Sequence, residues 1–169
     1  GPIEIQKPWF YSNMIVENNF VLSRHTEYDL IDENRIVSLG STRFSDEWST
    51  ILPDILPIKK IPNQRSSDLK ILFLVSKPKY SGFSEEVDRV SNFISMFPGV
   101  QLVIKPHTRG QRFNIRSGAN IFIADNSYHS SQLIDWADLI LFTMTSVIYD
   151  ALKKDKPILY MKCTHSNKL

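Results

Sequence analysis

Cysteine is almost missing from this sequence: Cys163 is the only one among 169 residues. A single cysteine excludes an internal disulfide framework and offers no pair of thiolate ligands for a metal ion. The composition therefore fits a reducing compartment. We expect Cys163 to be a small buried apolar residue rather than a nucleophile.

Long apolar runs and a strong charge of one sign are missing too. No run approaches the ~18 to 20 apolar residues that a membrane-spanning helix needs, and the N-terminus lacks the pattern of an export signal. Twenty Lys and Arg face eighteen Asp and Glu, a formal net charge of +2. That excess is too small for a nucleic-acid partner held through counterion release. We therefore expect no membrane span and no nucleic-acid partner.

What the chain does have is enough apolar content for a core. Hydrophobic residues make up 42% and aromatic residues 11% of the sequence, which suits one folded domain of this length. We assign residues 36–169 to this domain and residues 1–35 to an N-terminal segment or a linker from a preceding domain. The start at Gly1-Pro2 resembles the remnant of a removed tag, so we interpret the chain as an excised piece.

Short apolar runs alternate with segments of helical character. The runs are residues 36–39, 71–75, 102–104, 121–123, 139–142 and 158–161. Most are apolar at consecutive positions, as in strands that helices cover on both faces. The apolar residues of segments 83–97, 130–137 and 147–152 recur at helical spacing. This alternation predicts an α/β fold with a Rossmann-like, doubly wound parallel sheet.

Hydroxyls, a glycine and cations follow several of these strands. In a parallel sheet all strands end at the same edge, which is where such sheets bind ligands. Lys105, His107 and Arg109 alternate directly after the run 102–104, a pattern typical of an anion site. Phosphate fits this edge, because the start of a helix offers free N–H groups and a positive dipole end. The candidate phosphate contacts taken from these positions are Gly40, Ser41, Arg43, Lys105, His107, Arg109, Thr145 and Ser146.

Plainer roles remain open for the same residues. Ser146 is either a helix cap or a ligand contact, and Gly40 either serves a turn or allows close approach. His107 can be a loop histidine bonded to the backbone, and Lys105 a solvated charge. His129 is expected at the surface or in a cap. The sequence holds no glycine-rich phosphate loop, no metal-ligand spacing and no nucleophile elbow, so we predict no metal site and name no catalytic residue.

Four stretches together carry a family resemblance: "GSTRFSDEW", "VIKPHTRG", "SSQLIDWADLIL" and "TSVIYDALKKDKPIL". In this order they resemble the C-terminal, donor-binding domain of GT-B glycosyltransferases of bacterial surface polysaccharide synthesis, of the capsule and lipopolysaccharide kind. They are also similar to the glycerophosphate transferases of teichoic acid synthesis. The resemblance covers residues 36–162. It implies one half of a GT-B fold and a metal-independent enzyme whose substrate is a nucleotide-activated sugar, with no further cofactor.

The resemblance also implies roles for single residues. His107 would lie near the donor phosphate or ribose, and Thr145 and Ser146 would bind phosphate at a helix start. Ser130 and Ser131 would lie in the loop before the next helix. Asp150 would lie near the ribose, although many relatives have Glu at this position.

The other half of the enzyme is expected to come from a missing N-terminal domain. That domain would bind the acceptor, a polysaccharide or glycolipid, and would usually supply the general base, so this chain alone is expected to be inactive. The resemblance implies a cytoplasmic protein that can lie at the inner membrane face, with a pyrimidine nucleotide in its donor. A sugar-nucleotide 2-epimerase and a non-catalytic α/β interaction module remain the alternatives. The base, sugar, acceptor, linkage and oligomeric state stay open.

Overall fold

The computed structural model describes residues 14–16, 36–38, 42–57, 59–62, 68–76, 84–108, 114–115 and 120–164. The chain forms two compact units, which divide between Ile55 and Leu56. Each unit has a sheet of its own. The structure groups residues 36–55 with the N-terminal segment, whereas the sequence assigns them to the second domain.

In the part of the first unit that the structure describes, a pair of short parallel strands is followed by a helix. Strand β1 (Met14–Val16) pairs with β2 (Ile36–Ser38), and the 3-10 turn η2 (Thr42–Phe44) leads into α2 (Asp46–Ile55). The hydroxyl of Ser45 accepts a hydrogen bond from the N–H of Trp48 at 3.2 Å, so Ser45 caps this helix. The strand predicted at 36–39 does form. It pairs with β1 in a separate sheet, so the expectation that it joins the later strands is wrong.

The second unit is built on a five-stranded sheet in the order β5-β4-β3-β6-β7. Its strands are β3 (Leu69–Leu74), β4 (Val100–Lys105), β5 (Ile121–Ile123), β6 (Leu139–Phe142) and β7 (Ile158–Tyr160). Every neighbouring pair is parallel. The five predicted runs from residue 71 onward form these strands, which confirms the parallel sheet.

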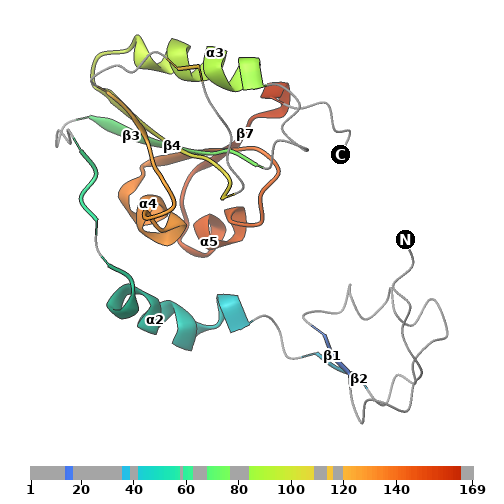
Figure 1. Ribbon diagram of the computed structural model, residues 1–169. Helices are drawn as coiled ribbons and strands as arrows, with labels where there is room; N and C mark the ends of the chain where they lie inside the picture. Colours follow the sequence, from blue (N-terminus) through green and yellow to red (C-terminus); the bar gives the residue numbers. More distant parts are fainter. Residues whose placement is uncertain are drawn as a thin grey trace. The chain divides into compact units, whose positions relative to one another are not determined.

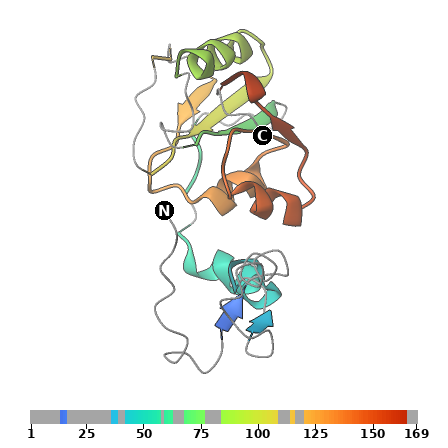
Figure 2. The same ribbon diagram turned by 90° about the vertical axis from the view of Figure 1, so that its right-hand side faces the viewer.

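Helices cover both faces of this sheet (Figure 1). Helix α3 (Ser84–Ser95) lies on one face, and α4 (Ser130–Trp136) and α5 (Ile148–Lys153) lie together on the other. The view turned by 90° shows the same layers (Figure 2). The fold is thus the doubly wound α/β class that the sequence predicts. A 3-10 turn, η3 (Lys162–Thr164), follows the last strand.

Two apolar clusters, one on each face, form the core. Phe73, Leu102 and Val87 belong to the cluster under α3. The cluster under α4 and α5 joins strand residues to helix residues: Leu72, Val103 and Ile140 from the sheet, with Leu133, Ile134 and Ala151 from the helices. Because the central strands are buried on both faces, residues 71–74 and 102–104 are apolar at every position. Each fully buried large side chain contributes about 1.5 to 3 kcal/mol to folding.

Two aromatic residues of the α3 segment lie outside this core. Val87, Val90 and Ile94 pack into the cluster as predicted, but Phe93 is 57% and Phe97 46% exposed. Phe93 directly precedes Ile94 and is therefore turned about 100° away from the core-facing stripe. The two phenylalanine rings contact each other edge to face, with centroids 5.1 Å apart. Phe83, the first residue of the predicted apolar face, lies outside the described residues.

The expectation that Cys163 is buried is wrong. Cys163 is exposed in η3. The next residue, Thr164, takes the buried position instead, and its hydroxyl donates to the Met161 carbonyl at 2.7 Å.

Candidate functional site

The order of the strands creates a switch point between β3 and β6. From β3 the chain proceeds to β4 and β5 on one side and then returns to β6 on the other side. Open parallel sheets bind ligands outside the carboxyl ends of the strands at such a point. We call the edge where these strands end the carboxyl edge and the opposite edge the amino edge.

Two buried residues join β3 to β6 at the carboxyl edge. The Thr143 hydroxyl accepts from the N–H of Ser76 at 2.7 Å and donates to the Leu74 carbonyl at 3.5 Å. Ser76 is 1% exposed and Thr143 is fully buried. Thr143 therefore holds the ends of β3 and β6 together at the switch point. Neither residue is among the predicted site residues, although both directly follow buried strands.

The hydroxyl of Ser76 is buried and has no hydrogen-bond partner among the described residues. An unpaired buried polar group costs about 1 to 3 kcal/mol. Such a group at the switch point is a donor that a ligand can satisfy.

Lys105 is the last residue of β4 and is only 8% exposed. Its ammonium donates to the backbone carbonyl of Asp125 at 2.5 Å. Burial lowers the pKa of Lys105 because it penalises the charged form, and the Asp125 carboxylate partly opposes this change. The alternative of a solvated surface charge is wrong. An ammonium has three N–H groups, so Lys105 can donate to an anion as well.

The loop after β5 holds a second charge close to this lysine. Both the hydroxyl and the N–H of Ser127 donate to the Asp125 carboxylate, the N–H at 2.7 Å. The hydroxyl contributes most to lowering the pKa of Asp125, so this exposed side chain stays ionised. The negative charge of Asp125 helps to keep Lys105 protonated.

The remaining predicted residues of the first half of the chain are placed only in part. His107 is half-buried in the segment directly after β4. Arg43 is exposed in the first unit, with its guanidinium 5.4 Å from the centre of the Phe44 ring. Gly40, Ser41 and Arg109 lie outside the described residues. Their contacts with a ligand stay predictions.

The start of α4 differs from the expectation. Ser130 and Ser131 are the first two residues of the helix and do not lie in a loop before it. His129 is the N-cap, and its Nδ1 accepts from the N–H of Ser131 at 3.2 Å. In the neutral ring the proton is then on Nε2. Of the two roles expected for His129, a surface position or a cap, the cap is confirmed. The helix therefore begins at Ser130 and includes both serines.

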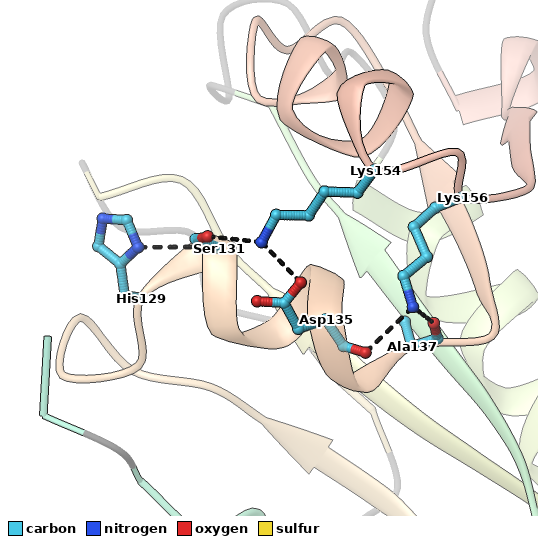
Figure 3. Close-up of polar contacts among 6 residues, drawn as sticks. All are labelled: His129, Ser131, Asp135, Ala137, Lys154 and Lys156. Carbon is cyan, nitrogen blue, oxygen red and sulfur yellow. Dashed lines mark hydrogen bonds and ion pairs between the residues drawn. The ribbon is translucent and has the colours of Figure 1, made fainter. Parts of the chain in front are cut away.

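Ser131 is also bonded through its side chain (Figure 3). Its hydroxyl accepts from the Lys154 ammonium at 3.0 Å, and the same ammonium lies 2.6 Å from a carboxylate oxygen of Asp135. Ser131 is 8% exposed. The residue predicted as a ligand contact thus has an internal partner that sequence spacing does not reveal.

Of the two hydroxyls expected at the start of α5, the one that accepts a backbone hydrogen bond belongs to Thr145. The hydroxyl of Thr145 accepts from the N–H of Val147 at 3.3 Å. Val147 is the N-cap and has helical backbone angles, and its side chain makes no capping hydrogen bond. Within the described chain the Ser146 hydroxyl makes no capping bond, so the capping alternative for Ser146 is wrong. Its contact with a ligand stays a prediction.

The first N–H groups of α5 already have partners. The N–H of Ile148 donates to the Thr145 carbonyl at 3.4 Å, and the N–H of Tyr149 donates to the Ser146 carbonyl at 3.3 Å. An anion at this helix start would therefore depend on the side-chain hydroxyls more than on free backbone donors. Asp150 lies half-buried in the same first turn.

No three His, Cys, Asp or Glu side chains in the described ranges gather where they would hold a metal ion. No helix in the part of the chain that the structure describes is long and apolar enough to cross a membrane.

Known proteins resemble this chain in fold only. No protein-family model matches the sequence, and no curated protein matches it. Among solved structures, the UDP-GlcNAc 2-epimerase of Methanocaldococcus jannaschii, in complex with UDP-GlcNAc and UDP, matches with a TM-score of 0.55 at 14% identity. The match covers 89% of this chain and 45% of that one. The chain has the fold of half of a GT-B enzyme.

Two further matches are weaker. The wall teichoic acid polymerase TagF gives a TM-score of 0.49 at 15% identity, over 89% of this chain and 39% of the polymerase. The glycosyltransferase GlyE of Streptococcus pneumoniae gives 0.41 at 16% identity, over 89% and 45%. The chain spans less than half the length of each of these proteins. The half GT-B fold that the sequence resemblance implies is confirmed.

Proposed function

We propose that the chain is the donor-binding half of a glycosyltransferase that uses a nucleotide-activated sugar to build a bacterial surface polysaccharide. One observation carries the proposal: buried polar groups gather at the switch point of a half GT-B fold. The Ser76 hydroxyl is buried and has no partner in the described part of the chain, and Lys105 is a buried ammonium on the neighbouring strand. Both are suited to a phosphate group.

The chemistry of glycosyl transfer fits these residues. The leaving group is a nucleotide phosphate, and its negative charge grows in the transition state. Fixed cations and hydroxyls stabilise this charge more strongly than that of the bound substrate, which is how they raise the rate. A phosphate beside Lys105 also favours the charged form of the lysine and offsets the burial that lowers its pKa.

The other contacts follow the sequence predictions, except that of Ser131. In the proposal His107 approaches the donor phosphate or ribose, and Ser146 contributes a hydroxyl that no cap occupies. Thr145 has a capping bond in addition, and Asp150 approaches the ribose. Ser131 acts within the protein, through its bonds to His129 and Lys154. Gly40, Ser41, Arg43, Arg109 and Ser130 keep their predicted roles as contacts.

The acceptor side belongs to a second domain in this proposal. A polysaccharide or glycolipid acceptor and the general base come from that domain, and the donor site alone transfers nothing. The matched solved structures are more than twice as long as the region that this chain covers in them. Transfer of a sugar by this chain on its own would contradict the proposal, whereas slow hydrolysis of the donor would not.

Calorimetry with a panel of nucleotides tests the proposal. We expect CMP, CDP or UDP to bind the chain with a Kd of about 1 μM to 1 mM, as in a half-built site. GDP and dTDP are the comparison for the base, and cytidine and uridine, which lack phosphate, should bind far more weakly. Addition of EDTA should change nothing. His107→Ala should weaken binding by about 1 to 3 kcal/mol without lowering the melting temperature.

The opposite results are equally clear. If no nucleotide binds, the chain is not a donor-binding domain, and a non-catalytic interaction module becomes the better description. If His107→Ala melts early and the folded part binds normally, His107 is a structural histidine.

A sugar-nucleotide 2-epimerase is the second candidate. The observation that favours it is the fold match to a UDP-GlcNAc 2-epimerase with a TM-score of 0.55. Both functions need a nucleotide site at the carboxyl edge, so binding alone does not separate them. Product analysis with a chain that contains both domains does: an isomerised sugar nucleotide indicates the epimerase, and a glycosylated acceptor indicates the transferase.

A further inference from the structure

Two lysines that follow α5 hold opposite ends of α4 (Figure 3). The ammonium of Lys154 bonds to Ser131 in the first turn of α4 and to Asp135 one turn later. The ammonium of Lys156 bonds to the backbone carbonyls of Asp135 and Ala137 at 3.0 and 2.8 Å, at the end of the helix. Between the lysines, Asp155 has a φ of 50°, a left-handed conformation that Asp tolerates better than most residues.

The two ends of α4 lie at different edges of the sheet. The helix follows β5 and precedes β6, so its first turn lies on the side of the carboxyl edge. Asp138, two residues after the end of the helix, exchanges hydrogen bonds with Lys70 at the start of β3 and so lies at the amino edge. Lys154 thus reaches the turn nearest the proposed donor site, and Lys156 holds the end farthest from it.

The first turn of α4 depends on such contacts for its position. The helix has seven residues, whereas an isolated helix needs about 12 to 15 to be even marginally stable in water. The N–H of Ser131 is held by His129 and its hydroxyl by Lys154. Lys105 lies on the same face of the sheet, because Val103, two residues earlier, packs in the cluster under α4.

The bonds of Lys154 distinguish it from a ligand-binding cation. Its side chain is 31% exposed and its charge is paired with Asp135. Although Lys154 lies at the end of its own helix, its side chain bonds to the neighbouring helix. We infer that Lys154 is a positioning residue: it fixes the first turn of α4 at the donor site without touching the donor. This inference rests on the proposed function.

The test compares Lys154→Met with the matched control Lys156→Met. Each variant removes one ammonium that bonds α4, and both should lower the melting temperature. Nucleotide affinity is measured by calorimetry with CDP and UDP, well below the melting temperature of either variant. We expect Lys154→Met to weaken binding about fivefold, the equivalent of one hydrogen bond, and Lys156→Met to leave it unchanged. Lys154→Arg, which can bond to both partners, should restore the affinity.

A second variant covers the case in which Lys154→Met does not fold. Asp135→Asn keeps the size of an exposed side chain and removes only the charge that holds Lys154, so a smaller loss of affinity is expected. Hydrogen exchange adds a local readout: the Ser131 amide should exchange faster in Lys154→Met and at the normal rate in Lys156→Met.

The outcomes separate the two proposals. If the unaltered chain binds nucleotide and Lys154→Met binds it equally well, the positioning role is wrong while the proposed function stands. Equal losses in Lys154→Met and Lys156→Met also overturn it, because they indicate general destabilisation. If the unaltered chain binds no nucleotide, the proposed function fails, and the positioning role fails with it.

Discussion

At the scale of single residues, the proposed donor site depends on a buried lysine. Lys105 ends a central strand, is 8% exposed and donates to the Asp125 carbonyl. Burial lowers its pKa, since a charged group loses solvation inside the protein. The sequence places this residue in an anion site but does not reveal the burial, because a lysine after a strand is exposed far more often than not.

Replacing Lys105 with Met tests its role. Met keeps most of the length and apolar surface but removes the charge, so the Asp125 carbonyl keeps only its bond from the N–H of Tyr128. We expect nucleotide affinity to fall by about 1.5 to 3 kcal/mol, the range for hydrogen bonds to charged groups. Lys59 is the control, because it is an exposed lysine whose charge also lowers the pKa of Asp125. Lys59→Met should change nucleotide affinity little. Equal effects of the two changes, measured by calorimetry, would show that only net charge matters.

Proton uptake is a second consequence of the lowered pKa of Lys105. The unfolded chain has a lysine pKa near 10.5, and the folded chain a lower one. Between the two values the unfolded state binds more protons, so this group makes stability rise with pH there. A bound phosphate raises the pKa again, and nucleotide binding should take up protons in that alkaline window. Calorimetry in buffers of different ionisation enthalpy measures the uptake, which should vanish in Lys105→Met; uptake that persists in the variant contradicts the assignment.

At the scale of helices, the sequence predicts bodies better than ends. The apolar spacing of segments 130–137 and 147–152 gives α4 and α5 nearly to the residue. Their caps are less predictable, because His129 is not among the usual N-cap residues and Val147 has no capping side chain. The bonds of Lys154 to a helix some twenty residues away follow from packing, which no local pattern reveals.

Two neighbouring hydroxyls before α5 should behave differently. Thr145→Ala removes the hydroxyl that accepts from Val147 and should cost about 1 kcal/mol of unfolding free energy. Ser146→Ala removes a hydroxyl with no capping role and should leave stability within about 0.5 kcal/mol while weakening nucleotide binding. Urea unfolding and calorimetry on both variants decide the matter. A stability loss confined to Ser146→Ala would reverse the assignment of the cap.

At the scale of the whole molecule, the sequence gives the sheet but not every partner in it. The runs that form β3, β4 and β6 are buried by helices on both faces, which leaves a continuous apolar signal, whereas those of the edge strands β5 and β7 are partly exposed. The run at 36–39 carries the same signal and forms a strand, yet it pairs with β1 in the first unit. A strand pattern reports burial and not the neighbour that provides it. For this reason the predicted convergence of Gly40, Ser41 and Arg43 on the carboxyl edge stays a prediction.

The position of a bound nucleotide on the chain is the sharpest test of a donor site at the carboxyl edge. Amide chemical shifts of the 169-residue chain are followed while CDP, or UDP, is added. The account predicts that the largest changes occur at the carboxyl edge, at Ser76, at residues 105–107 and at residues 143–146. Amides at the amino edge, such as those of Lys70 and Asp138, should stay in place. Saturable shifts confined to the amino edge, or no shifts at millimolar nucleotide, would contradict a donor site at the switch point.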